Sequence, residues 1–187
     1  GKNRFSYDMA LELTKRILNS EKKLLVNHQN KICIHQLEAK LEASLEININ
    51  GEKKPLHLNG IIDRIDSLNG KVRVIDYKSG KIEAKEVSFS KKNDQSAISS
   101  FSNCKHATQL IMYCVLYQNK YGKLPDIAGI YSVINQEKGV SNLKSSKLDL
   151  EEIVSLFPSF LEEMIQTLYD PNISIEHDEN AKYCSFC

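Results

Sequence analysis

Two aspartates and a lysine stand on two short apolar segments near the middle of this 187-residue sequence. Residues 56–66 and 71–78 are rich in β-branched side chains, and Asn69-Gly70 between them is a preferred pair for a two-residue hairpin turn. Paired residue numbers in such a hairpin sum to 139, so Asp63 is expected to face Asp76. The sequence therefore predicts two carboxylates opposite each other on neighbouring strands.

A pair of carboxylates at this spacing needs a positive partner. The Cβ atoms of directly opposed residues lie ~5 Å apart, where like charges repel. Because side chains alternate along a strand, Ile61, Ile65 and Val74 are predicted to surround the acids and bury them in part. A divalent ion with oxygen ligands, Mg²⁺ in the presence of phosphate, would neutralise them. Lys78 points to the same side, where it could orient a water or stabilise charge on a phosphate.

A simpler interpretation of these residues is a solvated edge of the sheet. The two acids could then pair with Arg64 and Lys78 in water and bind no metal. The opposite face of the hairpin offers a comparison, since Asp66 facing Arg73 there is an ordinary cross-strand ion pair. This contrast singles out the pair of acids, but the residues alone leave both interpretations open.

The composition is typical of a soluble globular domain, with 41% hydrophobic residues, 26% charged residues and a formal net charge of +1. The five cysteines are scattered, which favours a reducing compartment, and we expect a cytoplasmic protein. Neither a run of eighteen apolar residues nor a secretory leader is visible, so no membrane association is expected. The charge lacks a strong basic excess, although positive side chains gather locally. These are Lys78, Lys81, Lys85, Lys91, Lys92, Lys105 and His106.

The remaining elements follow from periodicity and from turn residues. An amphipathic helix with its apolar side on the core is expected first, followed by a strand-like segment that ends at a turn. A polar, serine-rich stretch is interpreted as a long loop. Gly122 should end a second helix, and Pro158 should kink or divide a third. The expected segments are the helix 7–26, the strand 32–48, the loop 88–103, the helix 105–121, the strand 127–134 and a helix from residue 149.

Three motifs together resemble a known family. Residues 60–66 read GIIDRID, residues 74–81 read VIDYKSGK, and residues 109–113 read QLIMY. They resemble the PD-(D/E)XK nuclease superfamily, and within it the RecB-like exonucleases, which include the nuclease domains of AddB-type helicase-nucleases. In that branch a G-x-I-D-R-x-D strand precedes a D-Y-K-[ST]-G-K strand and a Q-x-x-x-Y helix. The resemblance covers residues 38–117 and is specific because three motifs occur in the right order.

The resemblance implies a role for each matching residue. Asp63 and Asp76 would bind a catalytic Mg²⁺, with Mn²⁺ as an alternative, and Lys78 would assist the attacking water. Gln109 and Tyr113, one helical turn apart, would position DNA or brace the site. The implied fold is a single α/β domain with a restriction-endonuclease-like αβββαβ core and a mixed central β-sheet flanked by helices. Without the resemblance, a solvated Gln and a packed Tyr are the more common interpretation.

The sequence departs from the family in two places. A G-T-x-x-H stretch, whose histidine is a further metal ligand in many members, is absent, and neither His28 nor His35 has that context. Glu38 resembles the family's acidic residue before the first motif, and it is our candidate for an extra metal ligand. Some relatives carry an iron–sulfur cluster, which needs four thiolates, whereas only Cys184 and Cys187 occur late in this sequence. No such cluster is expected, and Cys33, Cys104 and Cys114 are interpreted as core residues.

The leading hypothesis is a Mg²⁺-dependent deoxyribonuclease that acts in DNA repair or recombination. Its expected partners are DNA and a helicase domain or subunit, because no phosphate-binding loop of a motor occurs in the chain. We expect one nuclease domain over residues 1–187, a fragment of a longer chain, with a helical lead-in (1–30), a catalytic core (31–135) and a C-terminal helical region (136–187). One alternative is a nuclease-fold module that binds DNA or protein without cutting. The other is a zinc-stabilised domain, which is the weakest hypothesis because the sequence has too few ligands at metal-binding spacing.

Overall fold

A computed structural model of the protein describes residues 2–26, 30–49, 51–90, 96–102, 104–134 and 139–174. Its elements, in chain order, are α1 (Lys2–Val26), β1 (Ile32–Ile49), β2 (Glu52–Leu68), β3 (Lys71–Lys78), the 3₁₀ helix η1 (Ala84–Val87), α2 (Ala97–Ser102), α3 (Lys105–Tyr121), β4 (Ile127–Ser132), β5 (Val140–Asn142), α4 (Leu150–Ser155) and α5 (Phe157–Tyr169). Within the described ranges, no helix is both long enough and apolar enough to cross a membrane.

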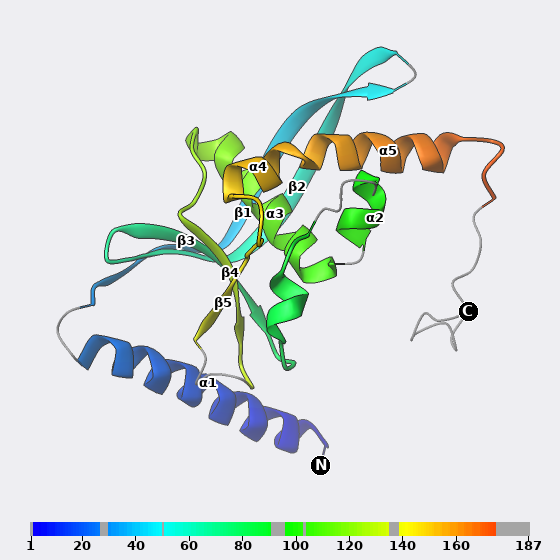
Figure 1. Ribbon diagram of the computed structural model, residues 1–187. Helices are drawn as coiled ribbons and strands as arrows, with labels where there is room; N and C mark the ends of the chain where they lie inside the picture. Colours follow the sequence, from blue (N-terminus) through cyan, green and yellow to red (C-terminus); the bar gives the residue numbers. More distant parts are fainter. Residues whose placement is uncertain are drawn as a thin grey trace.

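The strands form one five-stranded sheet in the order β1-β2-β3-β4-β5 (Figure 1). Neighbouring strands are antiparallel except for β3 and β4, which are parallel and are joined through η1, α2 and α3. This confirms the predicted α/β domain with a mixed sheet and its αβββαβ order. The sequence patterns missed the short elements η1 and β5, and β5 falls in the C-terminal region that we expected to be helical.

The hydrophobic core lies between the sheet and helix α3. Gly122 ends α3 with φ 72°, and its N–H donates to the Gln118 carbonyl, as predicted for a glycine cap. At Gly60, an added Cβ would lie 2.8 Å from Leu116 Cδ1, so β2 passes very close to α3 there. Buried core side chains from the sheet and α3 include Ile62, Ile65, Val74, Leu110, Ile111, Leu116 and Ile130.

Helix α1 does not pack as the sequence predicted. Figure 1 shows it along the bottom of the molecule, away from α3, α4 and α5. Its apolar residues are largely exposed, with Met9 at 48% and Leu24 at 40%, so the expected burial of this side in the core is wrong. Periodicity identifies an apolar side of a helix but not the surface that covers it.

The segment expected to be a long loop contains helix α2. Phe101 of α2 stacks on Phe160 of α5 with ring centroids 4.7 Å apart, and the Glu163 carboxylate accepts the N–H groups of Ala97 and Ile98. These tertiary contacts stabilise a helix of six residues that its own serine-rich sequence does not favour. Residues 91–95 and 103 of the expected loop, with Lys91 and Lys92, lie outside the described residues.

The C-terminal helices confirm the prediction for Pro158. Asp149 caps α4 through a reciprocal pair of hydrogen bonds with Glu152, and α5 begins with Pro158 in its first turn. The expected single helix is therefore divided in two. Cys184 and Cys187 lie outside the described residues, as do His28 and Asn50.

Candidate active site

The β2–β3 hairpin has the register that its turn predicts. Asn69 (φ 54°) and Gly70 (φ 82°) form the two-residue turn, and Ile65 pairs with Val74 as expected. The paired ladder ends at Arg64 and Ile75, one position before the two predicted acids would pair. The register is therefore confirmed, and the direct pairing of the acids is replaced by a different contact.

That contact joins the Asp63 side chain to the main chain of β3. Asp63 Oδ2 accepts the N–H of Tyr77 at 2.8 Å. The carboxylate takes the place of a main-chain acceptor, so it is fixed to the strand that carries Asp76 and Lys78. Asp63 stays partly exposed, whereas Asp76 is 2% exposed.

The alternation of side chains along β2 breaks at Asp63. Gly60 faces α3. On β3, Asp76 contacts α3, and Val74 lies on the same face as Asp76 because it is two residues away. Ile65 pairs with Val74, so Ile65 faces α3 as well. Residues five apart cannot share a face of a regular strand. The prediction that Ile61 lies beside the acids is consequently wrong, and Ile61 is 46% exposed.

Glu38 lies opposite this break on β1. Its neighbours Leu37 and Ala39 pair with Arg64 and Ile62, which places Glu38 across from Asp63. Glu38 has φ 50°, a left-handed conformation that is uncommon for a residue with a side chain and that marks functional sites more often than ordinary strands. Its side chain is exposed. Two of the three predicted metal ligands thus lie at one irregularity shared by two strands.

Asp76 is held by the two polar residues of the predicted helix motif. Gln109 Nε2 donates to Asp76 Oδ1 at 2.9 Å and to the Tyr113 hydroxyl at 2.8 Å, and that hydroxyl donates to Asp76 Oδ1 at 3.2 Å. Both residues extend from the same side of α3. Burial, reinforced by the charges of Asp76 and Asp63, raises the pKa of Tyr113 to about 12. Its hydroxyl therefore remains a proton donor at neutral pH.

Lys78 provides the positive charge of the site. Its Nζ lies 2.9 Å from Asp76 Oδ2, and its side chain is 29% exposed. Among the described residues, this buried oxygen accepts no hydrogen bond, and the Lys78 ammonium is its counter-charge. Strand β4 fixes the Lys78 backbone, because Val133 N–H donates to the Lys78 carbonyl at 2.9 Å. The structure thus brings Asp76, Lys78, Gln109 and Tyr113 into direct contact, with Asp63 attached through Tyr77.

Residues 7–187 match the PD-(D/E)XK nuclease superfamily. The chain belongs to this superfamily. A search of curated proteins gives no match. Among solved structures, the chain is similar to "Crystal structure of SSO0001", with 21% identity over 91% of this chain and 64% of that one. The TM-score of 0.33 is too low for this likeness to carry weight, and the chain spans less than two thirds of that structure's length.

Nucleases of the PD-(D/E)XK superfamily generally use Mg²⁺ or Mn²⁺, and the acids of this chain fit such an ion. In the part of the chain that the structure describes, no donor forms a hydrogen bond with the buried Asp76 Oδ2, and carboxylate oxygens are the ligands that Mg²⁺ prefers. Within the described residues, no three His, Cys, Asp or Glu side chains already converge as a metal cluster. Glu38, Asp63 and Asp76 therefore remain predicted ligands.

The sequence interpretation missed three residues around this PD-(D/E)XK site. Tyr77 donates its N–H to Asp63, Arg64 donates Nη1 to the Tyr77 hydroxyl at 2.9 Å, and Glu21 of α1 accepts from the same Nη1. The sequence did contain an indication that a carboxylate such as Glu21 was needed here. With Arg64 on the same face as the Asp66–Arg73 pair, two arginines share one aspartate, and a further carboxylate is needed to balance them.

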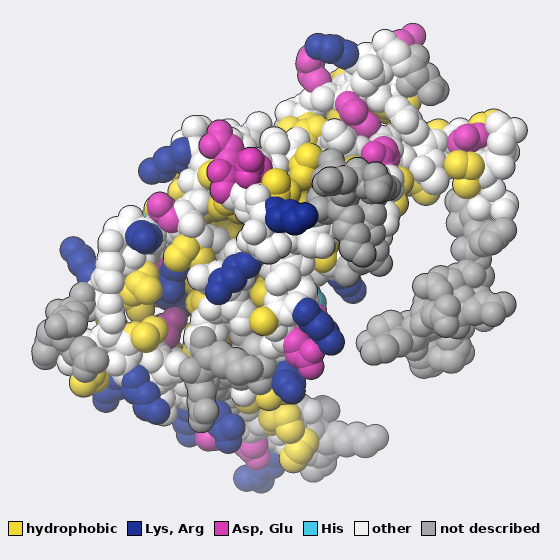
Figure 2. Space-filling model, in the orientation of Figure 1, with side chains coloured by type: hydrophobic (Ala, Val, Ile, Leu, Met, Phe, Trp, Pro, Cys, Tyr) yellow, Lys and Arg dark blue, Asp and Glu magenta, His cyan; other side chains and the backbone are white. Residues whose placement is uncertain are grey.

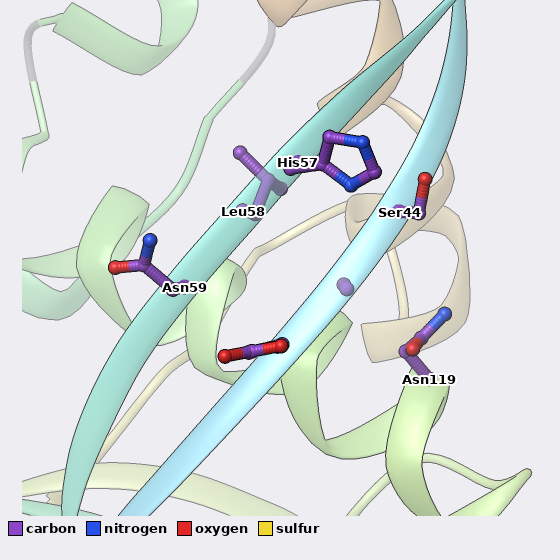
Figure 3. Close-up of a pocket in the computed structure, with 7 residues that line it drawn as sticks. Ser44, His57, Leu58, Asn59 and Asn119 are labelled. Carbon is purple, nitrogen blue, oxygen red and sulfur yellow. The ribbon is translucent and has the colours of Figure 1, made fainter.

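A concavity of about 340 Å³ lies away from the acids, on the β1–β2 ribbon and the end of α3 (Figure 3). It contains none of the predicted site residues. Its lining residues are Glu42, Ala43, Ser44, His57, Leu58, Asn59 and Asn119.

Basic side chains do not form one continuous patch on the face displayed in Figure 2, where Lys and Arg are interspersed with Asp and Glu. Lys81 and Lys105 are exposed, and Lys85 pairs with Glu83 at 3.0 Å in solvent. The local excess of lysines noted in the sequence thus consists largely of solvated side chains among the described residues.

Proposed function

We propose that this chain is the nuclease domain of a metal-dependent deoxyribonuclease of the RecB-like exonuclease type, acting in DNA repair or recombination. Membership of the PD-(D/E)XK superfamily supports the most general part of this proposal, namely that the chain is a nuclease. DNA as the substrate, Mg²⁺ as the preferred ion and a helicase domain or subunit as the partner are finer parts of the proposal. The order of the three motifs along the chain supports them.

One observation supports the proposal: a carboxylate that is 2% exposed lies in contact with an ammonium group, an amide and a phenol hydroxyl. Asp76 lies within hydrogen-bond or ion-pair distance of Lys78, Gln109 and Tyr113. A buried anion with this set of partners is costly to keep for stability alone. A solvated sheet edge, the simpler interpretation of the sequence, does not agree with this burial.

The residues divide the chemistry between them. Asp63, Asp76 and Glu38 would hold the ion, which when bound lowers the pKa of a water and stabilises charge on the scissile phosphate. Lys78, as the cation next to Asp76, would orient the attacking water and stabilise the negative charge on the phosphate. The neutral Tyr113 hydroxyl and the Gln109 amide keep Asp76 Oδ1 in place.

Cleavage of linear and circular DNA in Mg²⁺ or Mn²⁺ tests this proposal. We expect the wild-type chain to degrade DNA and Asp76→Ala to lose at least about 100-fold in rate. Asp8→Ala is the matched control, since Asp8 is an exposed aspartate on α1. If wild type and Asp76→Ala leave DNA equally intact with either ion, catalysis is rejected. DNA binding without cleavage would then favour a non-cutting nuclease-fold module.

A further inference from the structure

A buried polar cluster lies on the face of β2 and β3 opposite α3. Arg64 is 3% exposed, Asp66 0% and Arg73 6%. Arg73 holds Asp66 through two hydrogen bonds of 2.7 Å, and Arg64 Nη2 lies 2.6 Å from Asp66 Oδ2. The expected cross-strand ion pair of Asp66 and Arg73 is therefore present, as part of a larger buried cluster.

The charges of this cluster balance only when α1 is counted. Two guanidinium groups face a single carboxylate within the sheet. Glu21, whose side chain is 18% exposed, supplies the second carboxylate through its contact with Arg64. Without Glu21, one buried guanidinium would have no counter-charge, which is strongly unfavourable. Helix α1, although poorly covered itself, thus completes the electrostatics beneath the site.

The same arginine leads directly to a predicted metal ligand. Arg64 Nη1 donates to the Tyr77 hydroxyl at 2.9 Å, and the Tyr77 N–H donates to Asp63 Oδ2 at 2.8 Å. The Tyr77 ring also lies against Tyr131 of β4, with centroids 5.9 Å apart. Tyr77 is therefore held at its ring and hydroxyl while its main chain orients the acid.

We infer that Glu21 of α1 is a positioning residue of the nuclease site, acting through Arg64 and Tyr77 on the orientation of Asp63. The inference rests on the proposed function, in which Asp63 binds the metal ion. Groups that orient metal ligands from outside contribute substantially to metal affinity. Helix α1 is then a functional element, and its docking sets how well the site binds its ion.

Helix α1 has a second contact with the sheet that does not involve Glu21. Asn30, four residues beyond the end of the helix, donates to the Leu24 carbonyl at 2.9 Å and accepts from Asn69 Nδ2 at 2.8 Å. This contact ties the end of α1 to the β2–β3 turn. A variant at Glu21 therefore tests the electrostatic contact itself.

Direct Mn²⁺ binding, measured by electron paramagnetic resonance without DNA, is the readout. We expect Glu21→Gln to weaken Mn²⁺ binding by roughly 10-fold or more, and the cleavage rate to recover at saturating Mn²⁺. Tyr77→Phe removes only the hydroxyl and should also weaken Mn²⁺ binding. This second variant tests the same connection if Glu21→Gln does not fold. The matched control is Glu12→Gln, because Glu12 makes an exposed ion pair with Arg16 on the same helix.

The outcomes separate the two proposals. If wild type binds Mn²⁺ and cleaves DNA while folded Glu21→Gln and Tyr77→Phe bind Mn²⁺ as tightly as Glu12→Gln, the positioning role is overturned and the proposed function stands. If wild type neither binds Mn²⁺ nor cleaves, the proposed function fails and the positioning role fails with it. Weaker binding in both variants, with Glu12→Gln unchanged, supports both.

Discussion

The Asp63 carboxylate accepts the main-chain N–H of Tyr77 at 2.8 Å, at the position where the β2–β3 ladder stops. This hydrogen bond fixes one predicted metal ligand to the strand that carries the other. The Asp63 side chain is consequently held against the backbone of β3, one residue after Asp76.

Replacing Lys78 should separate metal binding from cleavage. Lys78→Met keeps the aliphatic stem but removes the ammonium group 2.9 Å from Asp76 Oδ2. We expect the cleavage rate to fall by about 100-fold, while Mn²⁺ binding becomes tighter because no cation competes for that oxygen. Rates and Mn²⁺ titrations of Lys78→Met and of the exposed control Lys81→Met check this. A parallel loss of binding and cleavage would contradict it.

Removing the Tyr113 hydroxyl should lower the cleavage rate by an amount that corresponds to the loss of one buried hydrogen bond. Tyr113→Phe leaves Asp76 Oδ1 with Gln109 alone, and we expect a loss of roughly 10-fold in cleavage rate. Gln109→Met should have a similar effect, and the double variant should lose less than the product of the two because the three groups form one network. Tyr117→Phe, on the same helix, is the control. Fully additive losses would show that Gln109 and Tyr113 act independently.

The parts of this site that the sequence predicted depend on local chemistry. The register of β2 and β3 follows from Asn69-Gly70, because few other residue pairs adopt two consecutive positive φ angles. The end of α3 follows from Gly122 for the same reason. Gln109 and Tyr113 then face Asp76 because a four-residue spacing places them on one side of a helix.

The parts that the sequence did not predict depend on distant partners. The break in alternation at Asp63 lies opposite the left-handed backbone of Glu38, which belongs to another strand. The short helix α2 depends on Phe160 and Glu163 of α5. Glu21 lies 43 residues before Arg64, and no local pattern connects the two. Turn residues and hydrophobic periodicity are local features of the sequence, so they do not predict contacts between distant residues.

Breaking the buried cluster should destabilise the fold far more than breaking a surface pair. Asp66→Asn leaves two buried guanidinium groups with Glu21 as their only carboxylate among the described residues, and we expect a loss of about 3–5 kcal/mol in the free energy of unfolding. Glu46→Gln, which breaks the exposed pair with Lys53, should change it by less than about 1 kcal/mol. Urea denaturation measures both. Equal effects would show that the cluster is not closed to solvent.

Alkaline pH should destabilise the protein through Cys114. Burial raises the pKa of this thiol from 9.0 to about 12, so the contribution to stability is complete below pH 9 and is lost as pH rises towards 12. In that window wild type should lose up to about 1.4 kcal/mol per pH unit more than Cys114→Ala. Denaturation midpoints from about pH 8 to about pH 11 give the comparison. Parallel pH profiles would exclude this thiol as the cause, since Tyr113 titrates in both proteins.

Glu38 and Asp63 are the two residues at which β1 and β2 leave the regular pattern together. If both residues were deleted, Ala39 would directly follow Leu37 and Ile62 would directly precede Arg64. Side chains would then alternate regularly along both strands, and the apolar ones would still face α3. Such a protein would lose a strained backbone position, but it would also lose Asp63, the predicted partner of Asp76 in metal binding. The extra residue in each strand is therefore needed by the site and not by the core, and deletion of Glu38 and Asp63 together should remove activity before it harms the core.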